Sequence, residues 1–360
     1  MNKLLTIIIP SYNMEKYLER CCSSLVVDDP ALMARLEVLV VNDGSTDKTS
    51  EIGHAWEAKY PGVFRVIDKP NGHYGSCVNR GLAEAKGVFV KVLDADDYCD
   101  RANFGALVAE LAKHEEGDVD LVVSESETVD ETGKVTGKLP RLEDVLNGNG
   151  KERLGHHSIV YRTERIRMIG YRQTEGVAYT DTEFIITPMT VVRRYICFPK
   201  VVTYYLVGRE GQSIAPENLV KCYEVLSKLL MPLVEQYRDC REKILSGGRE
   251  LYLRQIHYTV RMMYWFFFRV YACRLPHTAT LEDFDAKMKE LAPDLAVIAD
   301  NLEVKTRLFT VYPYRAYRRH GSFRCWSTFV YRAYIWVAVR LRKVGDMMVC
   351  KPIKGVVNAN

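Results

Sequence analysis

The first 125 residues alternate between short apolar runs and segments with helical spacing, and this alternation limits the possible folds more than any other feature of the chain. Apolar, mostly β-branched runs predict strands at residues 4–9, 37–41, 63–67, 88–93 and 119–123. Between them, apolar residues at helical spacing predict helices at 15–27, 47–60, 76–85 and 103–114. Strands joined through helices of this length form βαβ units, so we expect an α/β fold with a mainly parallel, Rossmann-like sheet flanked by helices.

Three of these expected strands run directly into polar sequence: PSYN at 10–13, NDGSTD at 42–47 and DADD at 94–97. In open α/β sheets, ligands bind at the carboxyl ends of the strands. Each segment alone has a structural explanation, since NDGSTD could be a capped turn and DADD a helix N-terminus. Their convergence on one edge favours a site. Carboxylates as close as Asp94 and Asp96 repel unless a cation lies between them, and their hard oxygen atoms suit Mg²⁺ or Mn²⁺.

Several other classes of protein are disfavoured by what the sequence lacks. It has no GxxxxGK[ST] loop and no GxGxxG after the first strand, which argues against a Walker-type NTPase and a dinucleotide dehydrogenase. The ten cysteines are scattered without a CxxC pair, which is typical of reduced thiols in the cytosol. The opening MNKLLTIIIPSYN has too short an apolar core for a signal peptide, and we interpret it as the first strand.

Four motifs in order, TIIIPSYN, EVLVVNDGSTDKT, NGHYGSCVNRGLAEAKGVFVKVLDADDY and YTDTEF, resemble those of bacterial-type family 2 glycosyltransferases with the GT-A fold. The resemblance covers residues 4–210. It implies an inverting enzyme that moves a sugar from a nucleotide-diphosphate sugar, here expected to be a UDP-sugar, to a hydroxyl of a glycan or lipid-linked acceptor. It also implies a Mg²⁺ or Mn²⁺ cofactor on the DxD motif and an aspartate that acts as the general base.

Carried over position by position, the resemblance implies a donor site at the strand ends. Asp96 would bind the metal that bridges the diphosphate, and Asp94 would face both the ribose and the metal. Gly72 could admit the nucleotide or be an ordinary turn glycine, and His73 could touch the diphosphate or be only solvated. Pro10 and Tyr12 would line the nucleoside pocket, and Asn71 would lie close to the nucleotide. Asp43 would form a hydrogen bond to the base or the ribose.

The general base is expected in the stretch GVAYTDTEF. Asp181 matches the aspartate of the family's Glu-Asp pair, while Thr180 replaces the usual glutamate, and Glu183 is the alternative base nearby. Farther along the chain, Arg209 could bind the diphosphate oxygens through its planar fork, or it could form a surface ion pair with Glu210.

The chain is expected to divide into a GT-A domain at 1–216 and a helical region at 217–360.

The net charge is +4, yet residues 305–343 hold ten Lys/Arg and no Asp/Glu among many aromatic residues. This composition predicts either an in-plane helix on an anionic membrane or a subdomain that packs on the core. The apolar runs are too short to span a membrane, and no nucleic-acid-binding module accompanies the charge. We therefore expect a cytoplasmic protein, either free or peripheral on the inner face of the cell membrane.

Two rival interpretations remain open. A sugar-1-phosphate nucleotidyltransferase would use a similar sheet but needs a Gly-rich, Arg-containing loop after the first strand, and PSYNMEKY lacks it. A non-catalytic nucleotide-sugar binding protein is the second rival, for which Thr180 is the one hint. The sequence favours the glycosyltransferase and does not identify the donor sugar or the acceptor.

Overall fold

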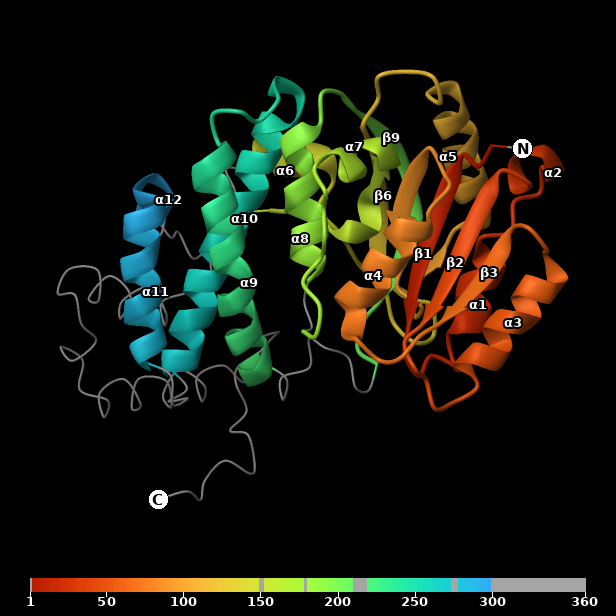
Figure 1. Ribbon diagram of the computed structural model, residues 1–360, viewed down its shortest axis with the longest axis horizontal. Helices are drawn as coiled ribbons and strands as arrows, with labels where there is room; N and C mark the ends of the chain where they lie inside the picture. The colour runs from red at the N-terminus through yellow and green to blue at the C-terminus, as the bar shows by residue number, and fades with distance from the viewer. Residues whose placement is uncertain (1, 149–151, 178–179, 210–218, 273–277, 299–360) are drawn as a thin grey trace. The chain divides into compact units, whose positions relative to one another are not determined.

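The computed structural model describes residues 2–148, 152–177, 180–209, 219–272 and 278–298 (Figure 1). The chain forms two compact units. The first runs to Ser213 and also includes Asp239–Tyr258, while the second contains the remaining described helical segments. The boundary at Ser213 lies close to the expected one at residue 216. Residues 239–258, expected in the helical region, belong to the first unit instead.

The first unit is built on one sheet, whose first half is parallel as the alternating pattern predicts. Its strands run in the order β3-β2-β1-β4, and β1, β2 and β3 lie side by side in Figure 1. In β1 and β2 every residue is buried, as expected for strands covered on both faces. The bounds are β1 (Leu5–Ser11), β2 (Leu36–Asn42), β3 (Phe64–Asp68) and β4 (Phe89–Val92).

The second half of the sheet is mixed, so the expectation of a mainly parallel sheet applies to the first four strands alone. The order continues β4-β8-β6-β9-β5, with β7 paired to β6 as a hairpin. Strand β8 is antiparallel to both of its neighbours, whereas β9 is parallel to β6. The sequence predicted β6 as a strand at 119–123, but the βαβ pattern ends before β8, which explains why the antiparallel pairing of β8 was not predicted. The bounds are β5 (Tyr98–Cys99), β6 (Leu121–Val129), β7 (Val135–Lys138), β8 (Ile159–Arg162) and β9 (Tyr195–Leu206).

The helices predicted between the first strands are confirmed, with ends shifted by a few residues. The short helix α2 was not predicted, although its start is clear: the Asp29 side chain accepts hydrogen bonds from the backbone N–H groups of Ala31 and Leu32. The helices of the first unit are α1 (Leu18–Ser24), α2 (Pro30–Met33), α3 (Thr49–Lys59), α4 (His73–Glu84), α5 (Arg101–Lys113), α6 (Leu142–Asn147), α7 (Thr163–Met168) and α8 (Asp181–Ile186), with 3₁₀ turns η1 (His156–Ser158) and η2 (Thr187–Val191).

Helix α4 packs closely on β1, and this contact places its N-terminus beside the strand ends. A Cβ on Gly81 would come within 2.5 Å of Ile8 Cγ2, so a larger residue would push the helix off the sheet. The helix begins at His73, three residues earlier than predicted. The NGHYGS segment therefore reaches the same sheet edge as the ends of β1 and β2.

The remaining helices include the two longest that the structure describes, α9 and α10, and α10 starts in the first unit. A Cβ on Gly247 would lie 1.5 Å from the carbonyl oxygen of Arg193, so this start packs directly on the first unit's backbone. None of the helices that the structure describes has the length and apolar character needed to cross a membrane. Residues 305–343 and Glu210 lie outside the described ranges. The bounds are α9 (Leu219–Cys240), α10 (Ser246–Ala272), α11 (Thr278–Leu291) and α12 (Pro293–Ile298).

Candidate active site

Asp43, the residue expected to bind the nucleoside, is buried immediately after β2. Its carboxylate accepts hydrogen bonds from the Lys69 ammonium and, at 2.9 Å, from the backbone N–H of Gly72. Lys69 also donates to Ser76 Oγ at 2.8 Å. Lys69 was not predicted as a site residue, because a lysine after a strand has no distinguishing pattern. It holds Asp43 in place next to the start of α4.

Gly72, expected with Asn71 to lie close to the nucleotide, lies beside Asp43, to which its backbone N–H donates. Gly72 was expected either to admit the nucleotide or to be an ordinary turn glycine, and neither alternative describes its contacts fully. Its φ of −142° is open to any residue, but a Cβ there would come within 2.7 Å of Ser76 Oγ and 3.2 Å of Lys69 Nζ. A Cβ on Gly44, whose φ is 70°, would come within 3.1 Å of the Asn71 backbone nitrogen. Gly72 is therefore needed for the close packing of the side chains that hold Asp43.

Pro10 and Tyr12 lie at the end of β1, next to Asp43. Pro10 is buried and paired in register with Val41, and Tyr12, just beyond the strand, is 47% exposed. The Asp43 N–H donates to the Ser11 carbonyl at 2.8 Å, which continues the pairing of the two strands. The exposed Tyr12 thus follows the strand end whose backbone pairs with Asp43.

A buried histidine, His156, connects Asp94 with Asp181. Its Nε2 lies 3.3 Å from Asp94 Oδ2, and its Nδ1 lies 3.9 Å from Asp181 Oδ2. Burial opposes a charge on this imidazole, but the two carboxylates raise its pKa above the ordinary value. Burial likewise acts against ionised Asp94, yet His156 and the hydroxyl of Tyr74 hold the pKa of Asp94 below its usual range.

His156 and its neighbour His157 were missed by the sequence analysis. The signal was present as two adjacent histidines directly before the strand Ile159–Arg162. Its meaning depends on the topology, because β8 inserts between β4 and β6 and so carries the preceding η1 turn to the end of β4. The alternating pattern did not predict that insertion.

Asp181 is the first residue of α8, and it differs from its neighbour Glu183. Arg153 Nη2 donates to Asp181 Oδ2 at 3.4 Å, and the carboxylate is 25% exposed. Glu183 is buried, and its two oxygens accept from the backbone N–H and the hydroxyl of Thr174, at 2.8 and 2.7 Å. Burial raises the pKa of Glu183. Thr180, where the family has glutamate, is fully buried and accepts from Gln173 Nε2. Glu183 thus stabilises the loop that contains Thr174, whereas Asp181 faces His156.

The other two carboxylates of the DADD segment have different partners. Asp96 is paired with the Arg209 guanidinium, and burial together with the charge of Asp94 raises its pKa. Asp97 is fully buried, with Oδ1 accepting from the Leu206 N–H at 2.9 Å and Oδ2 lying 3.0 Å from His157 Nδ1. Burial raises the pKa of Asp97 well above its usual range. Asp97 therefore ties this loop to β9, while Asp94 faces His156 and Asp96 faces Arg209.

The side chains around Asp94 fit a divalent cation. One ligand atom from each of Asp94, His156 and His157 lies within 4.8 Å of the other two, and in the described part of the chain this is the single His/Cys/Asp/Glu group with such geometry. Nε2 of His156 is buried without a hydrogen-bond partner among the described residues. Carboxylate and imidazole ligands suit Mn²⁺ and related ions, so the residues present fit a metal here.

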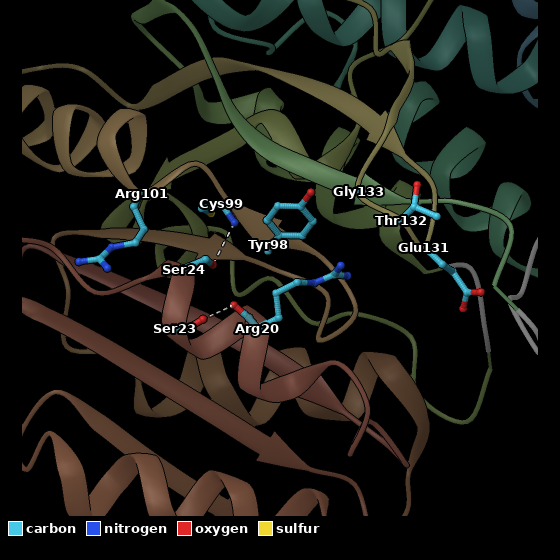
Figure 2. A pocket seen from close by; sticks show the side chains of 9 residues that line it. All are labelled: Arg20, Ser23, Ser24, Tyr98, Cys99, Arg101, Glu131, Thr132 and Gly133. Atoms are coloured by element: carbon cyan, nitrogen blue, oxygen red, sulfur yellow. Dashed lines mark hydrogen bonds between the residues drawn. The ribbon is translucent and has the colours of Figure 1, made fainter.

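A separate cavity of about 440 Å³ lies next to this cluster, and none of the predicted site residues lines it. Figure 2 shows its lining, with Arg20 beside the ring of Tyr98. Arg20 connects it to the DADD segment, since its Nη2 donates to the Asp96 carbonyl at 3.0 Å. Glu131 is its one carboxylate. The acidic strand ends, and not this cavity, therefore form the candidate active site.

Comparison with known proteins agrees with this geometry. The model of the family described as "Glycosyl transferase family 2" matches residues 6–198. The uncharacterized glycosyltransferase EpsJ of Bacillus subtilis is 35% identical over 115 residues, which cover 32% of this chain and 32% of EpsJ, so the match spans about a third of that relative's length.

Two solved structures have a similar fold. The crystal structure of S. aureus TarS 1–349 in complex with UDP-GlcNAc aligns with a TM-score of 0.55 and 19% identity, covering 89% of this chain and 92% of that one. The mannosyltransferase PcManGT from Pyrobaculum calidifontis, in complex with GDP-Man and Mn²⁺, aligns with a TM-score of 0.52 and 18% identity, covering 94% and 87%. The family match extends over more than half of the residues, and this chain belongs to glycosyl transferase family 2, with the GT-A fold.

Proposed function

We propose that the protein is a metal-assisted, inverting glycosyltransferase that moves a sugar from a UDP-sugar to a hydroxyl of a glycan or lipid-linked acceptor. One observation carries the proposal: Asp94, at the end of β4, and Asp181, at the start of α8, lie on opposite ring nitrogens of one buried imidazole. Asp94, the carboxylate expected on the donor side, and Asp181, the expected base, are therefore separated by a single imidazole ring. This proximity suits a single-displacement reaction.

The nucleoside end of the donor would lie between β1 and the start of α4. Asp43 is positioned there by Lys69 and Gly72, with the exposed ring of Tyr12 nearby. Arg209, beside Asp96, is suited to the diphosphate because a guanidinium can bind two oxygens at once. A nucleotide sugar is the donor in the TarS and PcManGT complexes, which supports the same class of donor here.

In the proposed reaction the acceptor oxygen attacks the anomeric carbon from the face opposite the diphosphate. Asp181 takes the hydroxyl proton, the new C–O bond forms, and the bond from the anomeric carbon to the diphosphate oxygen breaks. The electron pair leaves with the nucleoside diphosphate. Arg153, on Asp181 Oδ2, orients the base.

A divalent cation held by Asp94 and Asp96 would supply Lewis-acid stabilisation of the leaving diphosphate. Of the two carboxylates, Asp96 is the more deeply buried and is paired with Arg209, so the donor diphosphate would meet both an arginine and the metal ligands at one point.

The test combines binding with turnover. Calorimetry with UDP, in the presence and absence of Mn²⁺, should show binding that the metal strengthens, and incubation with a panel of nucleotide sugars should then release nucleoside diphosphate. Binding with no release under any acceptor condition would support a non-catalytic binding protein instead. Formation of UTP from a UDP-sugar and added pyrophosphate would support the nucleotidyltransferase.

We also propose that the basic segment 305–343 binds an anionic membrane surface. Ten Lys/Arg without a single Asp/Glu, interspersed with tyrosine and tryptophan, is a composition suited to the headgroup region. A lipid-linked acceptor would then be presented to the active site at the inner face of the membrane.

A further inference from the structure

His156 is a buried group to which neither the sequence motifs nor the family comparison gives a role. It is 5% exposed, and its Nε2 has no hydrogen-bond partner among the described residues although it lies 3.3 Å from Asp94 Oδ2. Nε2 faces the Asp94 carboxylate but does not form a hydrogen bond to it, and a buried polar atom without a hydrogen bond costs free energy because it has lost its water. This arrangement suggests that another group, absent from the polypeptide, binds Nε2.

The position of the His156 ring is fixed from several sides. Its centroid lies 3.8 Å from that of His157 and 6.5 Å from that of Tyr74, whose hydroxyl donates to Asp94 Oδ1 at 2.9 Å. His157 stacks in turn on Tyr205, and its Nδ1 faces the fully buried Asp97. His157 therefore faces the fully buried Asp97, whereas His156 faces Asp94.

We propose that His156 is a ligand, through Nε2, of the same divalent cation that Asp94 and Asp96 would hold, an inference that rests on the proposed metal-assisted function. The other ring nitrogen, Nδ1, faces Asp181 at 3.9 Å. A metal-bound histidine commonly directs its second nitrogen towards a carboxylate, and here that carboxylate is the proposed base. Metal binding and the position of the base are thus linked through one ring.

An imidazole ligand changes which metal the site prefers. Mg²⁺ favours oxygen ligands and dehydrates reluctantly, while Mn²⁺ lies on the series of ions that accept imidazole nitrogen more readily. The sequence alone, showing only aspartates, predicted Mg²⁺ or Mn²⁺ without a preference. With His156 among the ligands, we expect Mn²⁺ to bind more tightly than Mg²⁺.

Pulsed electron paramagnetic resonance of the protein with Mn²⁺ and UDP tests this directly, because it detects nitrogen nuclei bound to the metal. The wild type should show the nitrogen signal, and His156→Gln, which places an oxygen near the same point, should lose it. Titration should show the Kd for Mn²⁺ rising at least about tenfold in this variant, since even loss of a group that only orients a ligand costs ~10–100-fold. The preference for Mn²⁺ over Mg²⁺ should fall with it.

His114→Gln is the matched control, since this histidine pairs with Glu110 on α5, and it should keep both the signal and the affinity. Thermal unfolding of each variant, with His156→Asn as a second replacement, separates metal loss from misfolding. Mn²⁺ binding with an unchanged nitrogen signal in both His156 variants would overturn the ligand assignment alone. Loss of the signal in His157→Gln but not in His156→Gln would overturn it as well. No Mn²⁺ binding at all, with UDP binding intact, would remove the metal from the proposed function too.

Discussion

Asp181 and Glu183 lie two residues apart in the same short helix, but their surroundings give them different roles. Asp181 is partly exposed and faces His156 and Arg153, while both oxygens of Glu183 are used by Thr174. A general base must reach the acceptor with a free lone pair. The difference between them is therefore one of hydrogen bonding and exposure, which the local sequence does not show.

Asp181→Asn should lower kcat by about 10²–10⁴-fold, the range that general-base catalysis contributes, and should leave the Kd for UDP nearly unchanged. The amide keeps the size of the side chain but cannot take the proton. Steady-state kinetics with calorimetry would measure both. Glu183→Gln is the comparison, and a larger loss of kcat in that variant, with its fold intact, would move the base to Glu183.

Gly72→Ala should weaken UDP binding by roughly tenfold. Complete loss of a charge-assisted hydrogen bond costs about 1.5–3 kcal/mol, and this variant would strain the hydrogen bonds that hold Asp43 without removing them. The new Cβ would meet Ser76 Oγ and approach Lys69 Nζ, displacing the groups that hold Asp43. Calorimetry with UDP would measure the change. Unaltered affinity would show that Asp43 does not depend on this packing.

At the scale of elements, Asp120 connects several segments of the second half of the sheet, just before β6. Its Oδ1 accepts from Arg165 Nε of α7 at 2.7 Å, and its Oδ2 accepts from the Arg193 N–H at 2.8 Å. Its side chain is fully buried, and the arginine is nearly so. These contacts connect α7, the start of β6 and the segment leading to β9, the elements that place the η1 turn and α8 around the site.

Asp120→Ala should lower the free energy of unfolding by about 3–5 kcal/mol, because it leaves a buried arginine without its partner. Urea titration followed by circular dichroism would measure the change. Asp118→Ala is the matched control: its ion pair with Arg194 is exposed, so the expected loss is below about 1 kcal/mol. Equal effects of the two variants would contradict the role given to Asp120.

Helix α5 offers an independent test at the same scale. Gly105 lies inside this helix, and an added Cβ would make ordinary contact with one Val27 methyl group at 3.6 Å. Gly105→Ala should raise the free energy of unfolding by roughly 0.5–1 kcal/mol, since alanine loses less backbone entropy in a helix. The Kd for UDP should stay constant, which also makes this variant a control for Gly72→Ala.

For the whole molecule, charge is distributed unevenly along the chain. Removing residues 305–343 from the count leaves 40 basic and 46 acidic residues, so the net positive charge comes from this one segment. An acidic body repels an anionic membrane, whereas a basic segment is drawn to it. The protein would then approach the membrane in an orientation set by this segment.

The protein should bind vesicles that contain phosphatidylglycerol more tightly than vesicles of phosphatidylcholine alone, and added salt should weaken the binding. Replacing Arg315, Arg318 and Arg319 by glutamine should weaken it by about 3 kcal/mol, at ~1 kcal/mol for each basic residue near the surface. Cosedimentation would measure this.

Glutamine at Lys86, Lys134 and Lys138, three exposed lysines of the first unit, removes the same charge and serves as the control. If both triple variants lost affinity equally, net charge and not the basic segment would account for the binding. If no anionic vesicle bound the wild type, the alternative of packing on the core would be favoured.

The sequence by itself determined the parallel half of the sheet and the positions of Asp43 after β2 and of Asp94 and Asp96 after β4, because local periodicity specifies each strand and the βαβ connection orders them. Only the tertiary structure decided which carboxylates face one another. Asp96 is paired with Arg209, and Asp94 and Asp181 meet across His156, contacts between residues far apart in the chain. They depend on β8 entering the sheet antiparallel between β4 and β6. Such an insertion is stabilised by long-range strand pairing, which leaves no periodic signal in the sequence around His156.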